Sequence, residues 1–328
     1  MGVAMAKKPD WEIPLVAQPK PEEFDFDLDH VLQSVVGLQA HIPEDAFTAQ
    51  TLGTERAGSG VVIRDGGLVL TIGYLITEAE SIWLSTPDGR AMAAHALAYD
   101  QETGFGLVQA LGQLGLPALE LGRSSDIEPG DPIIVAGGGR RQSVRANVIG
   151  RQEFAGYWEY LLNEAIFTAP AHPFWGGTGL IGSDGKLLGI GSLMVQQVTE
   201  RDTVRDINMV VPIDILKPIL QDLLTLGRQN RPARPWLGLF SAERDGRVLV
   251  ADVVPRGPAA AAGVKQGDTI WAVRDESVTG LADFYRKVWA SGSAGTEIPI
   301  EVVREGRTVW VRIKSADRAK LLRAPRLQ

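Results

Sequence analysis

The sequence predicts a mostly β protein, with a β-sandwich or a pair of β-barrels in its first two thirds. From about residue 33 to residue 213, short apolar runs alternate with turns rich in Gly, Asp and Pro. Many strands at this spacing, with no long helical periodicity between them, indicate an all-β unit. The pairs Asp65-Gly66, Asp88-Gly89 and Asp184-Gly185 are predicted hairpin turns, since these residue types adopt positive φ at low cost. The clearest strand-like runs are Val35–Gln39, Gly60–Ile63, Leu68–Thr71, Pro132–Ala136 and Leu187–Leu193.

Composition excludes several classes of function. The 328 residues suffice for two or three domains, and the net charge of −7 argues against nucleic acid or an anionic membrane as the main partner. The chain has no cysteine, which excludes disulfides and thiolate chemistry. The four histidines (His30, His41, His95 and His172) lack metal-ligand spacing. We therefore expect neither a metal site nor a cofactor.

The N-terminal residues and the lack of long apolar stretches in the sequence suggest a location for the protein. Residues 1–21 contain no apolar run of signal-peptide length, and no stretch approaches the roughly 18–20 apolar residues of a membrane helix. A cytoplasmic protein without a membrane span is the resulting expectation. Met5 makes the start codon uncertain, so an export signal upstream stays open.

Changes in composition divide the chain into five parts. Residues 1–30, rich in Pro and acids, are predicted to be a flexible acidic arm, although Phe24 and Phe26 leave a packing role open. The β unit follows at 31–214, and then a linker helix with its linker at 215–233. The helix is expected from Ile215 to Leu226, with Asp214 as N-cap and Gly227 as C-cap. A second compact unit occupies 234–317, before a basic tail at 318–328.

Four segments of the β unit, in the right order, resemble the Deg/HtrA type of trypsin-like serine protease. They are Gly58–Ile63 with Leu68–Thr71, Leu121–Gly137, Phe174–Ile190 and Asp206–Pro212. The resemblance covers about residues 33–226. It implies a chymotrypsin-like double β-barrel for 31–214, and the family's habit of forming trimers makes self-association an expectation.

Aligned with the motifs of that family, the three triad positions hold other residues. The nucleophile position is Gly176 within Phe174-Trp175-Gly176-Gly177-Thr178, the histidine position is Tyr74, and the carboxylate position is Gly104. A triad needs a hydroxyl, an imidazole and a carboxylate acting together, and a phenol is a poor base at neutral pH. We therefore expect no catalytic residue at these positions and a chain that is not an enzyme.

A shift of register does not restore the missing groups. The hydroxyl nearest to Gly176 is that of Thr178, and no histidine lies between His41 and His95. His172 is predicted to be a turn residue packed on Trp175. Phe174 and Trp175 replace small residues of the family motif, so we expect them either to fill the former cleft or to contact a peptide.

The second unit resembles a PDZ domain of the same family, which makes it an α+β domain. The resemblance rests on Gly257-Pro258-Ala259, followed by Gly263-Val264 and by Gly267-Asp268-Thr269-Ile270. It implies a carboxylate-binding loop at Trp236, Leu237, Gly238 and Leu239. Tyr285 and Val288, on a helix over 281–291, are expected either to face the peptide or to be ordinary core residues.

These observations predict a catalytically inactive Deg/HtrA-like pseudoprotease. It would bind extended peptides or protein C-termini through its PDZ domain, as a scaffold, adaptor or regulator. Its partners would include such peptides and either an active Deg/HtrA relative or a second copy of itself. Two alternatives stay open: an active serine endopeptidase of this type, and small-molecule binding in the vacated cleft, lined by Tyr74, Phe174 and Trp175.

Overall fold

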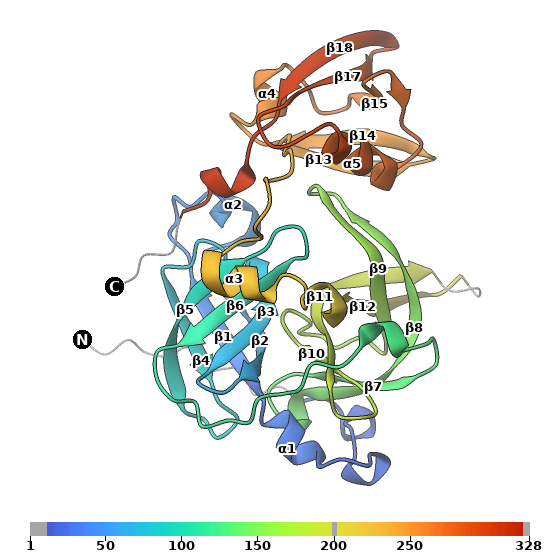
Figure 1. The fold of residues 1–328 in the computed structure, drawn as a ribbon. Helices are drawn as coiled ribbons and strands as arrows, with labels where there is room; N and C mark the ends of the chain where they lie inside the picture. Colours follow the sequence, from blue (N-terminus) through green and yellow to red (C-terminus); the bar gives the residue numbers. More distant parts are fainter. Residues whose placement is uncertain (1–11, 199–201, 324–328) are drawn as a thin grey trace.

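Two closed β-barrels make up the larger part of the molecule, as a computed structural model describes it for residues 12–198 and 202–323 (Figure 1). The first barrel has the strand order β1-β2-β3-β6-β5-β4. Its strands are antiparallel and comprise β1 (Val35–His41), β2 (Glu55–Arg64), β3 (Leu68–Ile72), β4 (Ser81–Ser85), β5 (Ala91–Tyr99) and β6 (Phe105–Ala110). The predicted mostly β, chymotrypsin-like double barrel is confirmed.

The second barrel repeats this arrangement with the order β10-β11-β12-β9-β8-β7. Two long strands, β8 and β9, form a hairpin that extends beyond the barrel toward the C-terminal unit (Figure 1). The strands of this barrel are β7 (Pro132–Ala136), β8 (Ser143–Gly156), β9 (Tyr160–Ala169), β10 (Gly179–Ile181), β11 (Leu187–Val198) and β12 (Val204–Pro212).

Side-chain alternation explains why these segments form barrel walls. In β4, Ile82 and Leu84 are buried while Trp83, between them, is exposed. Period-two burial of this kind is what a strand with one covered face requires. β3 is buried along its whole length, because Leu68–Ile72 lies between the barrel interior and neighbouring segments. The cores of the two barrels merge, since Leu70 and Ile190 belong to one continuous apolar cluster.

The N-terminal segment differs from the predicted flexible arm. Its described part contains two 3₁₀ turns and the helix α1 (Leu28–Leu32). Ile13 is buried in the second-barrel core, and its N–H donates to Arg141 O at 2.9 Å. Leu28 lies in the main core, with Phe24 and Phe26 packed against it. Apolar residues spaced through the acidic stretch therefore anchor it, and residues 1–11 of the predicted arm lie outside the described residues.

The linker helix begins later than predicted. Residues Ile213–Ile215 form a 3₁₀ turn, and α3 runs only over Leu220–Leu226. It ends where predicted, at Gly227, whose φ of +69° provides the left-handed cap. Asp214 is not an N-cap: its carboxylate accepts from Ser125 N at 2.8 Å and from Lys217 Nζ at 2.7 Å.

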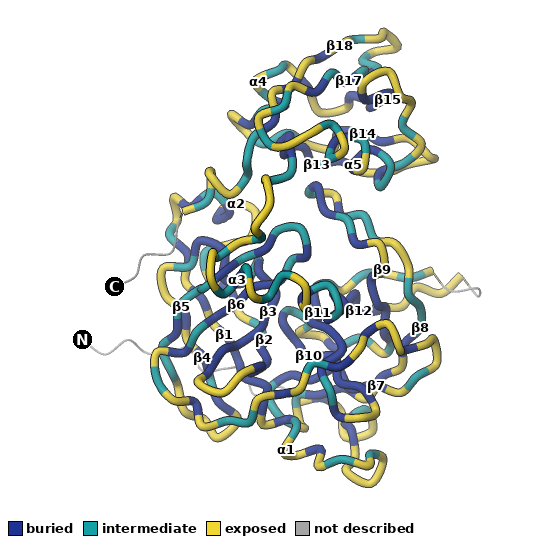
Figure 2. Tube along the Cα trace, in the orientation of Figure 1, coloured by how far each residue is buried: buried dark blue, intermediate teal, exposed yellow. Residues whose placement is uncertain are grey.

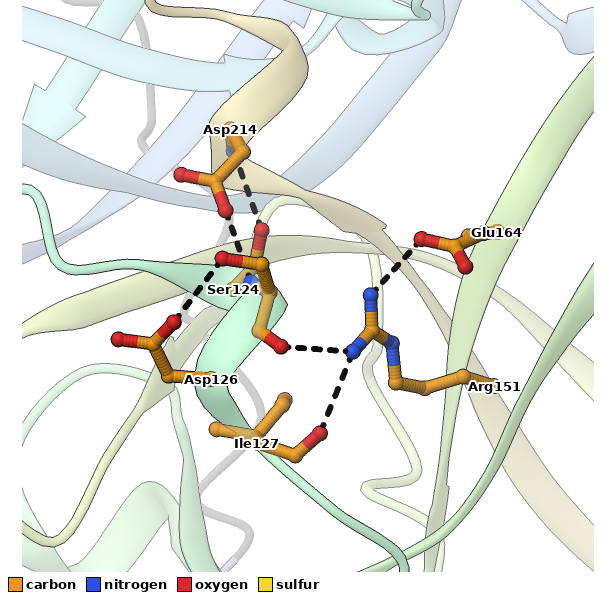
Figure 3. A network of polar contacts seen from close by, with 7 residues as sticks. Ser124, Asp126, Ile127, Arg151, Glu164 and Asp214 are labelled. Carbon is orange, nitrogen blue, oxygen red and sulfur yellow. Dashed lines mark hydrogen bonds and ion pairs between the residues drawn. The ribbon is translucent and has the colours of Figure 1, made fainter.

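These contacts of Asp214 belong to a polar network that ties the linker to the second barrel (Figure 3). Asp214 N donates to Ser124 Oγ at 3.1 Å, and Arg151 on β8 donates to Ser125 O at 3.0 Å. Arg151 also pairs with Glu164 on β9 at 2.8 Å. The start of the linker is thus fixed to the base of the β8–β9 hairpin.

The C-terminal unit has one antiparallel sheet in the order β13-β14-β15-β17-β18, with β16 paired to β15. The helices α4 (Pro258–Ala261) and α5 (Leu281–Ala290) accompany the sheet, close to their predicted ranges. The strands are β13 (Leu239–Arg244), β14 (Arg247–Val253), β15 (Thr269–Val273), β16 (Glu276–Ser277), β17 (Glu297–Arg304) and β18 (Arg307–Lys314). Since β13 pairs only with β14 among the named strands, it is an edge strand that a further strand can join.

Both ends of this unit contact the first barrel. Arg231 in the linker and Arg234 at the start of the unit pair with Glu102, and the Arg234 guanidinium lies 4.5 Å from the centre of the Trp289 ring. The basic tail, predicted at 318–328, starts with a 3₁₀ turn over Arg318–Leu321 and returns to the first barrel, where Arg323 N donates to Glu78 at 3.0 Å. Residues 324–328 lie outside the described residues. None of the described helices has the length and apolar character needed to cross a bilayer.

Candidate functional site

The structure places the predicted histidine and nucleophile positions against each other. Tyr74 lies on a 3₁₀ turn after β3, and its hydroxyl donates to Ser192 O on β11 at 2.8 Å. A Cβ added at Gly176 would lie 2.7 Å from Tyr74 Oη. Burial raises the pKa of the Tyr74 phenol well above its usual value, so the group stays protonated at neutral pH. Tyr74 is thus a hydrogen-bond donor that occupies the space beside position 176.

The predicted carboxylate position adjoins the same turn. Gly73 N donates to Gly104 O at 2.7 Å, so the residue before Tyr74 is bonded directly to Gly104. Gly104 has a φ of +85°, and a Cβ there would lie 2.9 Å from Tyr160 Oη. The Tyr160 hydroxyl donates to Thr103 O at 2.7 Å. The three predicted positions are therefore neighbours, and Tyr160, which sequence reasoning missed, restricts side chains at the third.

His172 stabilises the loop that carries Gly176. The ring is 1% exposed, and burial lowers its pKa, so the neutral imidazole is favoured. Its Nδ1 accepts from Phe174 N at 3.1 Å, which leaves the proton on Nε2 to be donated to Gln142 O at 2.8 Å. The predicted turn histidine is found at this loop. The backbone N–H of Phe174 is directed to His172 Nδ1.

The hydroxyl nearest to Gly176 in the sequence points into the loop. Thr178 is fully buried, and its Oγ1 donates to Trp175 O at 2.9 Å. Phe174 is 48% exposed and Trp175 is half-buried, so neither aromatic side chain is fully packed. The three residues predicted to line a cleft, Tyr74, Phe174 and Trp175, do not line the cavity of about 320 Å³ in this structure. That cavity lies between the first barrel and the PDZ unit, and its lining includes Tyr99, Glu102, Arg231, Trp289 and Arg318.

The predicted carboxylate-binding loop holds a carboxylate from elsewhere in the chain. One oxygen of Glu159 accepts from Leu237 N, Gly238 N and Leu239 N at 3.2, 2.7 and 3.0 Å, and the other accepts from Leu237 N at 3.0 Å. The φ of +76° at Gly238 brings these N–H groups to one side of the loop. Glu159 lies at the tip of the β8–β9 hairpin, and sequence reasoning missed it.

Trp236 plays a different part from its three neighbours. Its backbone N–H donates to Ala316 O at 3.0 Å, and its ring packs edge-on against Phe47 of the first barrel, with ring centres 6.1 Å apart. It anchors the loop to the rest of the molecule. Its N–H is therefore not one of the donors that surround Glu159.

The two predicted groove residues on α5 are both buried, and they differ in their contacts. Val288 packs in the core of the PDZ unit. Tyr285 also packs there, but its hydroxyl donates to Gly156 O at 2.8 Å and accepts from Glu159 N at 3.2 Å. Tyr285 thus reaches the hairpin tip, while Val288 is a core contact. Within residues 12–198 and 202–323, no three His, Cys, Asp or Glu residues are grouped so that they could hold a metal ion.

Comparison with known families and proteins supports this architecture. Residues 58–190 match the model of a trypsin-like peptidase domain, and residues 235–314 match that of a PDZ domain. A serine protease Do-like HtrA from Bacillus subtilis is 23% identical over 88% of this chain and 71% of its own length. A probable periplasmic serine endoprotease DegP-like protein from Pseudomonas fluorescens is 27% identical over 76% of this chain but only 54% of its own. A serine endoprotease DegS from Salmonella typhimurium is 24% identical over 89% and 85%.

Solved structures show the same fold. The HtrA-type protease AlgW with a tripeptide superposes with a TM-score of 0.53 at 22% identity, covering 91% of this chain and 97% of that one. A serine endoprotease from Yersinia pestis gives 0.52 at 23% identity, over 89% and 98%.

These comparisons contradict one sequence-based expectation. The chain was predicted not to be an enzyme, whereas the relatives are named serine proteases and endoproteases, which points to an enzyme. The prediction gave three residue positions more weight than the similarity of the whole chain. The assignment of Tyr74, Gly104 and Gly176 to the triad positions stays a prediction, since the relatives' names do not identify catalytic residues here.

Proposed function

We propose that this chain, whose two domains and relatives support the Deg/HtrA family, recognises the free C-termini of extended polypeptides through its PDZ domain. The observation that carries the proposal is the convergence of Leu237 N, Gly238 N and Leu239 N on one carboxylate. PDZ domains capture a terminal carboxylate with backbone N–H groups and add the peptide as a strand beside an edge strand. Here β13 is that edge strand, and α5 is the opposite wall.

The apolar surroundings of the loop define the class of peptide. The side chains of Leu237 and Leu239, whose N–H groups are two of the three donors, belong to the PDZ core. That core also contains Val288. We expect a C-terminal residue with an aliphatic side chain, because burial of such a side chain is favourable by about 1.5–3 kcal/mol. Location in the cytoplasm, and association with a relative or with a second copy, are further parts of the proposal that follow from the sequence.

The test of C-terminal recognition uses a labelled hexapeptide that ends in Val with a free carboxylate. Its amidated form is the matched control, since it differs only in the terminal charge. We expect fluorescence anisotropy to show binding of the free acid and at least tenfold weaker binding of the amide, equivalent to about 1.4 kcal/mol or more. Equal binding of both forms would contradict the proposal, because the N–H loop would then contribute nothing.

Serine endopeptidase activity is the second candidate function, and the names of the relatives favour it. The assay is cleavage of unfolded casein by the purified chain, with Thr178→Val as the variant that removes the hydroxyl nearest to Gly176 in the sequence while keeping the volume of the side chain. Cleavage that survives repurification supports this candidate, and its loss in the variant would locate the nucleophile. Absence of cleavage would overturn the candidate and leave C-terminal recognition unaffected.

A further inference from the structure

The tip of the β8–β9 hairpin has a backbone conformation that its sequence does not favour. Gly156 pairs with Tyr160, so Tyr157, Trp158 and Glu159 form a three-residue loop. Glu159 has a φ of +60°, in the left-handed region where glycine is preferred. A non-glycine residue there costs about 1–2 kcal/mol. Contacts outside the hairpin must offset this cost, and those contacts lie in the PDZ domain.

On one side, the tip contacts the PDZ domain as an added strand would. Ser241 N, on the edge strand β13, donates to Tyr157 O at 2.8 Å. Two residues further along the hairpin, the Glu159 carboxylate accepts from the three N–H groups of the loop that precedes β13. A main-chain bond to an edge strand together with a carboxylate held by backbone N–H groups is the combination by which a PDZ domain holds a peptide end.

On the other side, the tip contacts α5. Tyr285 bonds both Gly156 O and Glu159 N, and Ala155 and Leu161 pack against the PDZ core. The tip therefore lies between β13 and α5, and Glu159 is only 5% exposed. The hairpin reaches the underside of the PDZ unit in Figure 1, and Figure 2 shows buried residues near its end. Gly156 and Glu159 are buried there, whereas Tyr157 is exposed.

We propose that residues 156–159 are an internal ligand of the PDZ domain, with the Glu159 side chain in the place of a peptide's terminal carboxylate. An external C-terminus binds by displacing the hairpin tip. The inference rests on the proposed function, because both use the same N–H loop. The occupant is a segment of this chain, and its carboxyl oxygens accept from the N–H groups of the loop.

The state of Glu159 makes this occupancy reversible. Burial raises the pKa of the carboxyl to about 7, even though the loop N–H groups and the Arg318 charge lower it. Exposed glutamate has a pKa of about 4.3. Since the pKa is higher in the docked state, docking is strongest below about pH 4.3 and weakens as the pH rises toward 7. Tyr285 from α5 and Arg318 from the C-terminal turn are the other ionisable groups that act on it, and burial raises the pKa of the Tyr285 phenol above its usual value.

The decisive experiment measures the affinity of the free-acid hexapeptide for the wild type and for Glu159→Gln. The variant keeps the shape of the side chain and removes its charge. Because docking is strongest when the carboxyl is protonated, we expect this neutral variant to stay docked and to bind the peptide no more tightly than the wild type does at pH 5.5. We also expect wild-type affinity to increase from pH 5.5 to pH 8 and that of the variant to stay constant.

A second variant at Glu159 and a control variant at Glu164 complete the experiment. Glu159→Gly suits the left-handed turn and removes the side chain entirely, so it should open the loop and bind the peptide at least about tenfold more tightly than wild type, because the apparent dissociation constant falls as the fraction of open sites rises. Glu164→Gln changes an exposed glutamate on β9 that pairs with Arg151, and should leave the affinity within twofold of wild type. Amide hydrogen exchange at Leu237–Leu239 should be faster in Glu159→Gly than in wild type.

The outcomes separate the two proposals. Equal affinities for wild type and Glu159→Gly would overturn the internal ligand and leave C-terminal recognition standing. No binding of the free acid by any of the proteins at millimolar peptide, with exchange at Leu237–Leu239 still faster in Glu159→Gly, would overturn C-terminal recognition but retain the docked hairpin. Unchanged exchange would overturn the docked hairpin itself.

Discussion

Gly177→Ala is expected to lower the free energy of unfolding by about 4 kcal/mol, from overpacking and a left-handed non-glycine residue together. A Cβ at this position would lie 1.9 Å from Ser59 O and 2.6 Å from Thr71 Oγ1. Neither neighbour can move easily, because Thr71 Oγ1 donates to Ser59 O at 2.7 Å and Ser59 N donates to Gly176 O at 2.8 Å. Gly177 is therefore where the loop of the second barrel meets the wall of the first.

Gly115→Ala is the matched control for this experiment. Gly115 also has a positive φ, +64°, but a Cβ there would have no heavy atom within 4 Å. Its cost should be limited to the backbone preference of about 1–2 kcal/mol. Urea denaturation of both variants measures the difference. Similar losses in the two would show that the contact at Gly177 relaxes, and that the junction of the barrels is not tightly packed.

The strands and the PDZ unit could be predicted from the sequence because their signals are local. Alternation of apolar and polar side chains along β4 directly indicates a strand with one covered face. The Asp-Gly pairs directly indicate turns with positive φ. Pro132–Ala136 was predicted to the residue, and it is β7. The start of helix α3 was predicted too early in the chain, because apolar residues continue at helical spacing back to Ile215. Pro218 has no N–H to support a helix that starts there.

The contacts that matter most for function were not predictable, since they join distant parts of the chain. Tyr157-Trp158-Glu159 has the appearance of an ordinary hairpin turn, and the N–H groups that hold Glu159 lie in a separate domain. Tyr160 restricts the side chain at position 104 by a contact that likewise joins distant parts of the chain. The N-terminal arm was mispredicted for a related reason: acidic composition outweighed the few apolar residues, such as Ile13 and Leu28, that dock it. Composition describes a segment, whereas docking depends on the surface it meets.

Tyr74 and Gly176 form a pair whose members cannot be changed independently. Gly176→Ala should cost about 2 kcal/mol, because the new Cβ would meet the Tyr74 hydroxyl at 2.7 Å, and that hydroxyl is held by Ser192 O. Tyr74→Phe should cost about 1 kcal/mol for the lost hydrogen bond. The double variant should cost no more than Tyr74→Phe alone, since the next ring atom, Cζ, would lie 3.6 Å from the Cβ, an ordinary contact.

This double-mutant cycle should therefore give a coupling free energy of about −2 kcal/mol by urea denaturation, well outside the roughly 0.5 kcal/mol typical of independent sites. Additive costs would mean that Tyr74 can turn away from position 176, and that the site can accept a side chain there without any second change. A large coupling has a further consequence for the loop. Any side chain larger than that of glycine at position 176 meets the Tyr74 hydroxyl, so Gly176 and Tyr74 stabilise this site only as a pair.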